Sequence, residues 1–240
     1  MDFRIFFSPV PTGETTYLGW LLTGLRTTVA LSLASWVLAL ALGTVLGILR
    51  TVPNRGLRAF AGAYVELFRN VPLFVQLFIW YFVVPEIVPG GQRFKQIDPF
   101  TGLFLTSFAC LGLFTAARVC EIVRTGIESL PPGQGNAGLA LGFTLPQTYR
   151  HVLLPMAARL VVPPLTSETL NIVKNSAVCS TLGLFELTAQ GRQLVDYTAH
   201  AYESFTAVTV LYLLVNPAIQ LVMRAVESRA RVPGYLGSRN

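Results

Sequence analysis

Charged side chains are scarce in this chain. Asp, Glu, Lys and Arg make up 12% of its 240 residues, whereas hydrophobic residues make up 52%. Soluble domains are about one quarter charged, so this composition points to a membrane protein. Lysine is nearly absent, with only Lys95 and Lys174, and the net charge of +6 therefore comes almost entirely from arginine. Because the arginines lie between apolar runs, we interpret them as markers of membrane topology and expect no nucleic-acid partner.

Catalytic and redox signatures are also missing. The three cysteines, Cys110, Cys120 and Cys179, form no C-x-x-C pair and lie in apolar surroundings, which predicts buried thiols without a disulfide framework. The G-x(4)-G-K-[ST] phosphate loop is absent. No His-Cys-carboxylate spacing suggests a metal site. We therefore expect a chain that is not an enzyme, with no cofactor or metal of its own. The first fourteen residues contain no uninterrupted apolar run, so we expect no signal peptide.

What the chain does contain is long apolar segments. A helix needs about 20 apolar residues to cross the hydrocarbon core of a bilayer. The sequence predicts an all-α membrane protein, a single domain over 1–240, with five transmembrane helices at about 18–49, 58–84, 100–130, 156–184 and 205–223. Prolines predict a kink or a restart of the helix at 70–72 and an early interruption of the fourth span at Pro163 and Pro164. We expect a second break in that span near Lys174 to Ser176.

Arginine and lysine are distributed unequally between the two predicted faces. Eleven of them fall on one face: Arg50, Arg55, Arg58, Arg69, Arg124, Arg150, Arg159, Arg224, Arg229, Arg231 and Arg239. Five fall on the other face: Arg4, Arg26, Arg93, Lys95 and Arg192. The positive-inside rule then predicts a cytoplasmic C-terminus and a periplasmic N-terminus, as five spans require.

A polar segment at 133–155, rich in glycine and proline, separates the third and fourth spans. It cannot cross a bilayer, so it is expected to stand in the cytoplasm as a coupling loop. Asn136 is a favourable N-cap, and Gly142 suits the end of a helix, which predicts a short helix from Asn136 to Leu141.

The spacing of this loop resembles the EAA loop of binding-protein-dependent ABC importer permeases, E-A-A-x(3)-G-x(9)-I-x-L-P. The glutamate is replaced by Asn136 and the second alanine by Gly138, but the register is unbroken through Val152 and Leu154. In that family the helix docks into a cleft of the cytoplasmic ATPase. The resemblance therefore implies a set of ATPase-coupling residues: Asn136, Ala137, Gly138, Leu139, Gly142 and Pro155.

Further segments extend the resemblance over nearly the whole chain. The runs at 64–73 and 121–134 resemble polar amino-acid uptake permeases, and the runs at 115–121 and 171–177 are more narrowly similar to glutamate/aspartate permeases. This resemblance implies the type I ABC importer permease fold in the bacterial inner membrane. It also implies a second permease subunit, two ATPase subunits that bind ATP and Mg, and a periplasmic amino-acid-binding protein. The missing glutamate at position 136 suggests that the second permease is not identical to this chain.

Arg118, Glu168 and Lys174 are ionisable residues inside predicted spans, where a functional role is the default expectation. Arg118 stands where the wider amino-acid permease family usually has an aromatic residue, and a guanidinium can clamp a carboxylate. Lys174 and Glu168 lie in the fourth span. Ion pairs of Arg118 or Lys174 with Glu121 or Glu168 are the structural alternative. The predicted substrate site comprises Arg118, Lys174, Asn171, Asn175, Ser176 and Glu168.

Two further pairs have helical spacing, Glu66 with Arg69 and Glu121 with Arg124. Residues three apart share a helix face, so we expect both to be structural ion pairs. The leading hypothesis is a permease subunit of an ATP-driven importer of acidic amino acids. A secondary transporter driven by an ion gradient and a regulatory membrane subunit without a transport path are the alternatives. The absence of a detectable inverted repeat argues against the first of these, and the ionisable residues inside spans argue against the second.

Overall fold

The computed structural model describes residues 2–11, 13, 15–89, 91 and 97–230, and these residues form helices and no β-strand. The α-helices are α1 (Tyr17–Leu49), α2 (Arg55–Asn70), α3 (Leu73–Phe78), α4 (Val84–Ile87), α5 (Pro99–Glu128), α6 (Pro132–Ala140), α7 (Leu145–Thr148), α8 (Leu154–Asn175), α9 (Leu187–Thr198) and α10 (Ala201–Ala230). Four other segments are 3-10 helices, η1 (Phe3–Phe7) and η5 (Ser176–Leu182), or π-helices, η2 (Ile79–Val83) and η4 (Tyr149–Leu153).

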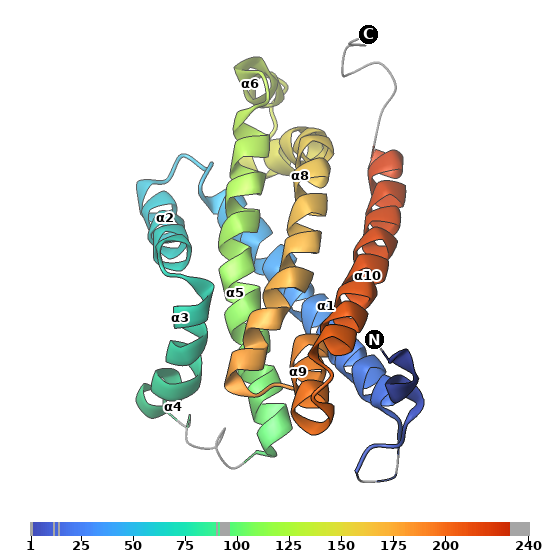
Figure 1. Cartoon of the computed structure of the whole chain (residues 1–240). Helices are drawn as coiled ribbons and strands as arrows, with labels where there is room; N and C mark the ends of the chain where they lie inside the picture. Colours follow the sequence, from blue (N-terminus) through green and yellow to red (C-terminus); the bar gives the residue numbers. More distant parts are fainter. Residues whose placement is uncertain (1, 12, 14, 90, 92–96, 231–240) are drawn as a thin grey trace.

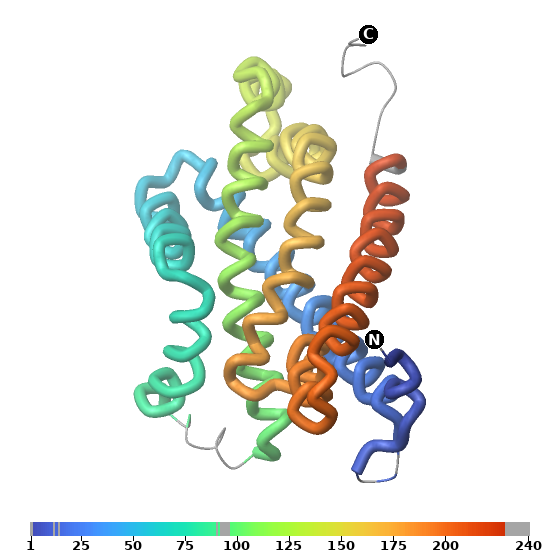
Figure 2. The backbone as a smooth tube through the Cα atoms, viewed as in Figure 1, coloured from blue at the N-terminus to red at the C-terminus, as the bar shows by residue number. Residues whose placement is uncertain are grey.

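The long helices form one bundle. Helices α5, α8 and α10 run alongside one another, and α1 crosses obliquely behind them (Figure 1). Helix α6 stands at one end of the bundle, and the C-terminal part of α10 points toward that end. Helices α4 and α9 lie at the opposite end, as the tube in Figure 2 also shows. The long helices therefore connect two distinct ends of the molecule.

The contact between α1 and α5 is the most extensive in the bundle. It depends on Gly43 and Gly47 of α1, which lie one helical turn apart. A Cβ atom at either position would come within 2.6 Å of the Cβ of Val119 or Val123 on α5. Small residues at this spacing let two helix backbones approach closely, which is the usual way that helices pack inside a membrane.

Three helices in the described part of the chain are long and apolar enough to cross a membrane: α1, α5 and Ala201–Ser228 of α10. A fourth is obtained if α2 and the segment Leu73–Ile87 count as one broken span. Helix α8 is not among them. By length and composition the structure thus supports three or four crossings, and five remains a prediction.

The break after α2 is much sharper than a proline kink. Helix α2 and the segment Leu73–Ile87 meet at an angle of 101°. The buried side chain of Gln76 stabilises this corner, since its Nε2 donates to the carbonyls of Phe68 and Val71, each at 2.8 Å. One side chain thus satisfies carbonyls that the end of α2 leaves without a helical partner.

Helix α8 contradicts one expectation and confirms another. Pro163 and Pro164 lie inside it without ending it, so the predicted early interruption is wrong. The irregular turn precedes the helix instead, in the π-helix η4. At Ser176 the chain does change from α to 3-10 geometry, where the sequence predicted a break.

Candidate functional site

The short helix α6 begins earlier than predicted. It spans Pro132–Ala140 and has Pro131 at its N-cap position, so Asn136 lies in the middle of the helix and the predicted N-cap is wrong. The reason is Pro132, whose fixed φ suits the first helical position and whose missing N–H costs nothing there. Asn136 and Ala137 are exposed. Helix α6 itself stands at one end of the bundle (Figure 1).

The end of α6 is as predicted. Gly142 has φ of 85°, and its N–H donates to the carbonyl of Leu139 at 3.0 Å. The N–H of Phe143 donates to the carbonyl of Gly138 at 3.1 Å. This pair of hydrogen bonds is the Schellman motif, which requires a left-handed residue after the helix and so favours glycine.

The end of the bundle around α6 presents apolar side chains to the outside. Leu139 is 48% exposed and Leu141 is 77% exposed. Gly138 is buried on the opposite side of α6, where a Cβ atom would come within 2.8 Å of the Thr148 side chain. Pro155, in the first turn of α8, is also exposed. Five of the six predicted coupling residues thus lie in or directly after α6, where Leu139 and the neighbouring Leu141 are exposed.

We expect Gly142→Val to uncouple this region while the bundle stays folded. Nothing lies within 4 Å of a Cβ at this position, so the only cost is backbone strain, about 1–2 kcal/mol or more for a β-branched residue. The measurement is transport-coupled ATP hydrolysis by the assembled complex. Gly142→Asn is the matched control, because asparagine tolerates this conformation. Normal coupling in the valine variant would contradict the assignment.

Arg118 and Glu168 are brought together from α5 and α8. Arg118 Nη1 lies 3.3 Å from Glu168 Oε1, and Asn171 Nδ2 donates to the same oxygen at 3.2 Å. The guanidinium also lies 5.4 Å from the centre of the Phe114 ring, a cation–π contact. The Arg118 side chain is 43% exposed and that of Glu168 is 14% exposed. Of the two partners that the sequence offered to Arg118, the structure selects Glu168.

The rest of the predicted substrate site does not join this group. Lys174 is exposed and forms no ion pair within the described residues, so neither Glu121 nor Glu168 is its partner. The Asn175 side chain makes no capping bond at the end of α8. Ser176 is completely buried, and its hydroxyl donates to the carbonyl of Val173 at 2.7 Å. The structure therefore groups Arg118, Glu168 and Asn171 and leaves the other three apart.

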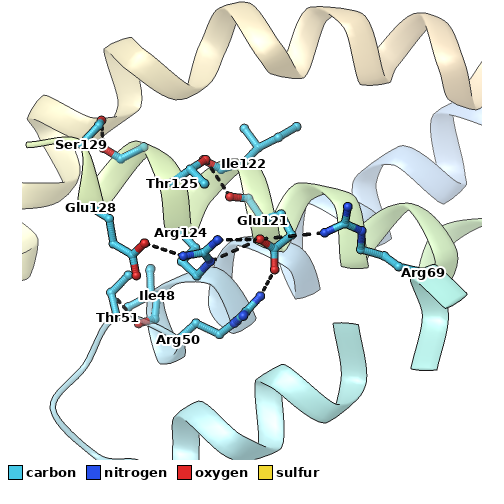
Figure 3. Close-up of polar contacts among 11 residues, drawn as sticks. Ile48, Arg50, Thr51, Arg69, Glu121, Ile122, Arg124, Thr125, Glu128 and Ser129 are labelled. Atoms are coloured by element: carbon cyan, nitrogen blue, oxygen red, sulfur yellow. Dashed lines mark hydrogen bonds and ion pairs between the residues drawn. The ribbon is translucent and has the colours of Figure 1, made fainter. Parts of the chain in front are cut away.

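A larger ionic cluster surrounds Glu121 (Figure 3). Its carboxylate pairs with Arg50 at the end of α1, with Arg124 one turn along α5 at 2.8 Å, and with Arg69 of α2 at 4.0 Å. Arg124 also pairs with Glu128. The predicted pair of Glu121 with Arg124 is confirmed, and one carboxylate joins three helices.

The predicted pair of Glu66 with Arg69 is wrong. Arg69 turns toward Glu121, because a partly buried carboxylate on α5 competes with an exposed one on its own helix. Glu66 lines the same polar pocket of about 440 Å³ as Arg69 and Glu121. The spacing along α2 therefore correctly placed Glu66 and Arg69 on one face of the helix, but it predicted the wrong partner for Arg69.

One buried carboxylate escaped the sequence analysis. Glu186 is fully buried at the N-cap of α9, where it accepts hydrogen bonds from the Ala189 N–H at 2.8 Å, Thr28 at 3.3 Å and Tyr212 at 3.2 Å. Burial raises the pKa of Glu186, and these donors oppose the shift. The sequence did carry one signal for this role, since an acidic residue directly before a helix is a favourable N-cap. Because its partners lie on α1 and α10, Glu186 fixes the end of the bundle opposite α6.

Three helices long and apolar enough to cross a membrane, joined into one bundle, indicate a membrane protein with several spans. A family model described as "Binding-protein-dependent transport system inner membrane component" matches residues 39–232. The chain belongs to this family and has its type I ABC permease fold.

Individual relatives agree with this assignment. The glutamate/aspartate import permease protein GltJ of Escherichia coli (strain K12) is 57% identical over 241 residues, covering 99% of this chain and 98% of its own. The glutamine transport system permease protein GlnP of the same strain is 30% identical over 212 residues, covering 88% and 93%. The solved structure of an amino acid ABC transporter with histidines has a TM-score of 0.74 at 26% identity, covering 89% of this chain and 95% of its own. The MetNI methionine ABC transporter, at 22% identity, 90% and 98% coverage and a TM-score of 0.74, shares the fold.

Proposed function

We propose that this chain is the membrane permease of an ATP-driven importer of glutamate and aspartate. The observation that carries the proposal is the 57% identity with the glutamate/aspartate import permease GltJ of Escherichia coli, which extends over 99% of this chain. The geometry agrees, since Arg118 offers a half-exposed guanidinium on a central helix. A dicarboxylic amino acid suits a cation in its path better than a neutral amino acid does.

The two ends of the bundle support the proposed partners. The α6 end, with its exposed Leu139 and Leu141, docks into a cytoplasmic ATPase in a complex of two ATPase and two permease subunits. The end with α4 and α9 faces a periplasmic amino-acid-binding protein. The N-terminus is periplasmic and the C-terminus cytoplasmic, as the arginine distribution requires. Asn136 replaces the glutamate of the EAA loop, which supports a non-identical second permease.

Purification of the tagged chain from its native membrane tests the proposal. We expect an ATPase and a second permease to co-purify in stoichiometric amounts. Proteoliposomes holding that complex should accumulate labelled glutamate and aspartate, but not glutamine, when ATP and the binding protein are supplied. A secondary transporter would respond to an ion gradient and ignore ATP, and a regulatory subunit would give no uptake. Isolation of an active complex with two copies of this chain and no other permease would contradict the heterodimer.

A further inference from the structure

Among the described residues, only one of the two carboxylate oxygens of Glu168 accepts hydrogen bonds. Its Oε1 atom receives both available donors, from Arg118 at 3.3 Å and from Asn171 at 3.2 Å. Its Oε2 atom is buried and has no hydrogen-bond partner in the described part of the chain. A buried carboxylate oxygen without a donor is costly, especially at membrane depth. The position therefore needs a donor that the chain itself does not supply.

Arg118, next to Glu168, has hydrogen-bond donors that no described residue uses. A guanidinium carries five N–H donors, and here only Nη1 is used, in a single contact with Glu168 instead of a bidentate pair. Phe114 supports the guanidinium from one side at 5.4 Å, and 43% of the side chain stays exposed. Arg118 therefore has donors free for a second carboxylate beside the one it already contacts.

A free acceptor and free donors on adjacent side chains match a ligand that carries both an ammonium and a carboxylate. We infer that Glu168 Oε2 accepts the α-ammonium of the transported amino acid, while the free N–H groups of Arg118 bind one of its carboxylates. This inference rests on the proposed function of the chain as an amino-acid permease. It makes Glu168 a specificity-determining residue, because a dicarboxylate without an amino group would leave Oε2 unsatisfied.

Asn171 has a positioning role in this arrangement. Its Nδ2 donates to Oε1 at 3.2 Å from one turn along α8, so it holds one oxygen of Glu168 and leaves the other for a further donor. The ion pair between Arg118 and Glu168 links α5 to α8. The ligand carboxylate would use the free N–H groups of Arg118, so this contact between the two helices can stay in place when the ligand binds.

The test compares carboxamide variants in the assembled complex. Glu168→Gln keeps the shape of the side chain and replaces the acceptor pair by an amide that cannot hold an ammonium as well. We expect glutamate uptake to fall by roughly tenfold or more, the scale of one lost hydrogen bond between charged groups. Glu66→Gln, the same change at an exposed carboxylate on α2, is the matched control and should transport normally. Uptake by the Glu168→Gln complex within twofold of the wild type would overturn the inference.

A second variant separates a binding role from a purely structural ion pair. Arg118→Met combined with Glu168→Met removes both charges, so no unpaired charge is left between the helices. We expect this complex to assemble and to lose uptake. If Glu168→Gln fails to assemble, the double variant decides: an assembled complex with normal uptake would overturn the inference. Wild-type proteoliposomes that take up no acidic amino acid would instead refute the proposed function, so the two failures are distinguishable.

Discussion

Replacing Arg118 by tyrosine is expected to abolish uptake of glutamate and aspartate while the complex still assembles. Tyrosine restores the aromatic character that the wider family usually has here, and it removes the guanidinium that lies 3.3 Å from Glu168. Because 43% of this side chain is exposed, the full cost of breaking a buried ion pair does not apply. The loss of one or more charged hydrogen bonds to substrate, about 1.5–3 kcal/mol each, is enough for a tenfold to hundredfold fall in uptake.

Uptake of labelled substrate by proteoliposomes measures this effect, and size-exclusion chromatography of the purified complex reports assembly. Arg58→Tyr is the matched control, since it makes the same substitution at an exposed arginine on α2. Normal glutamate and aspartate uptake by the Arg118→Tyr complex would remove Arg118 from the substrate site. The acidic substrate would then be supported by sequence identity alone.

Replacing Glu121 by glutamine should destabilise the chain more than any other single carboxamide change on α5. The substitution leaves Arg50, Arg69 and Arg124 facing a neutral amide (Figure 3). The Glu121 side chain is 19% exposed, so we expect a loss of about 3 kcal/mol, the lower end of the range for breaking a buried ion pair. Thermal unfolding of the solubilised complex measures the change as a lowered Tm.

Glu128 offers the control for this experiment on the same helix. Its side chain is 48% exposed and pairs only with Arg124 in the described structure, so Glu128→Gln should cost less than about 1 kcal/mol. Equal shifts in Tm for the two variants would show that Glu121 is an ordinary surface carboxylate. Because Glu121 joins α1, α2 and α5, the predicted difference tests whether one residue holds these three helices together.

Much of the architecture could be predicted from local patterns. Apolar runs located α1, α5 and α10, and the spacing of Gly142 located the end of α6. The start of α6 was misplaced because Asn136 is a favourable N-cap in isolation. Two prolines upstream supply a better first turn. The sequence predicted a kink or a restart after Asn70 but not a right-angle corner, because the corner depends on the buried Gln76 side chain, and burial is a tertiary property.

The ion pairs at the candidate site also depend on tertiary packing, which the sequence alone does not show. Arg118 and Glu168 are 50 positions apart, so the sequence offered two possible partners for Arg118 and no means of choosing between them. Glu121 and Arg124 share a helix face and were paired correctly, whereas Arg50 and Arg69 reach the same carboxylate from other helices. Spacing identifies neighbours on one helix. Which charges meet between helices depends on packing.

The corner after α2 has a consequence for the membrane itself. Helix α2 turns away by 101°, so only Leu73–Ile87, about 15 residues, remains to cross the bilayer beside it. At about 1.5 Å per residue this segment is roughly 22 Å long, shorter than a hydrocarbon core of about 30 Å. If this segment crosses the bilayer, the lipids next to it would compress their acyl chains, at a cost of fractions of a kcal/mol for each ångström of mismatch. Helix α1, with its 33 residues, is long enough for a thick bilayer, so the mismatch would be confined to the lipids beside this one segment and would make their tail length a variable of local stability.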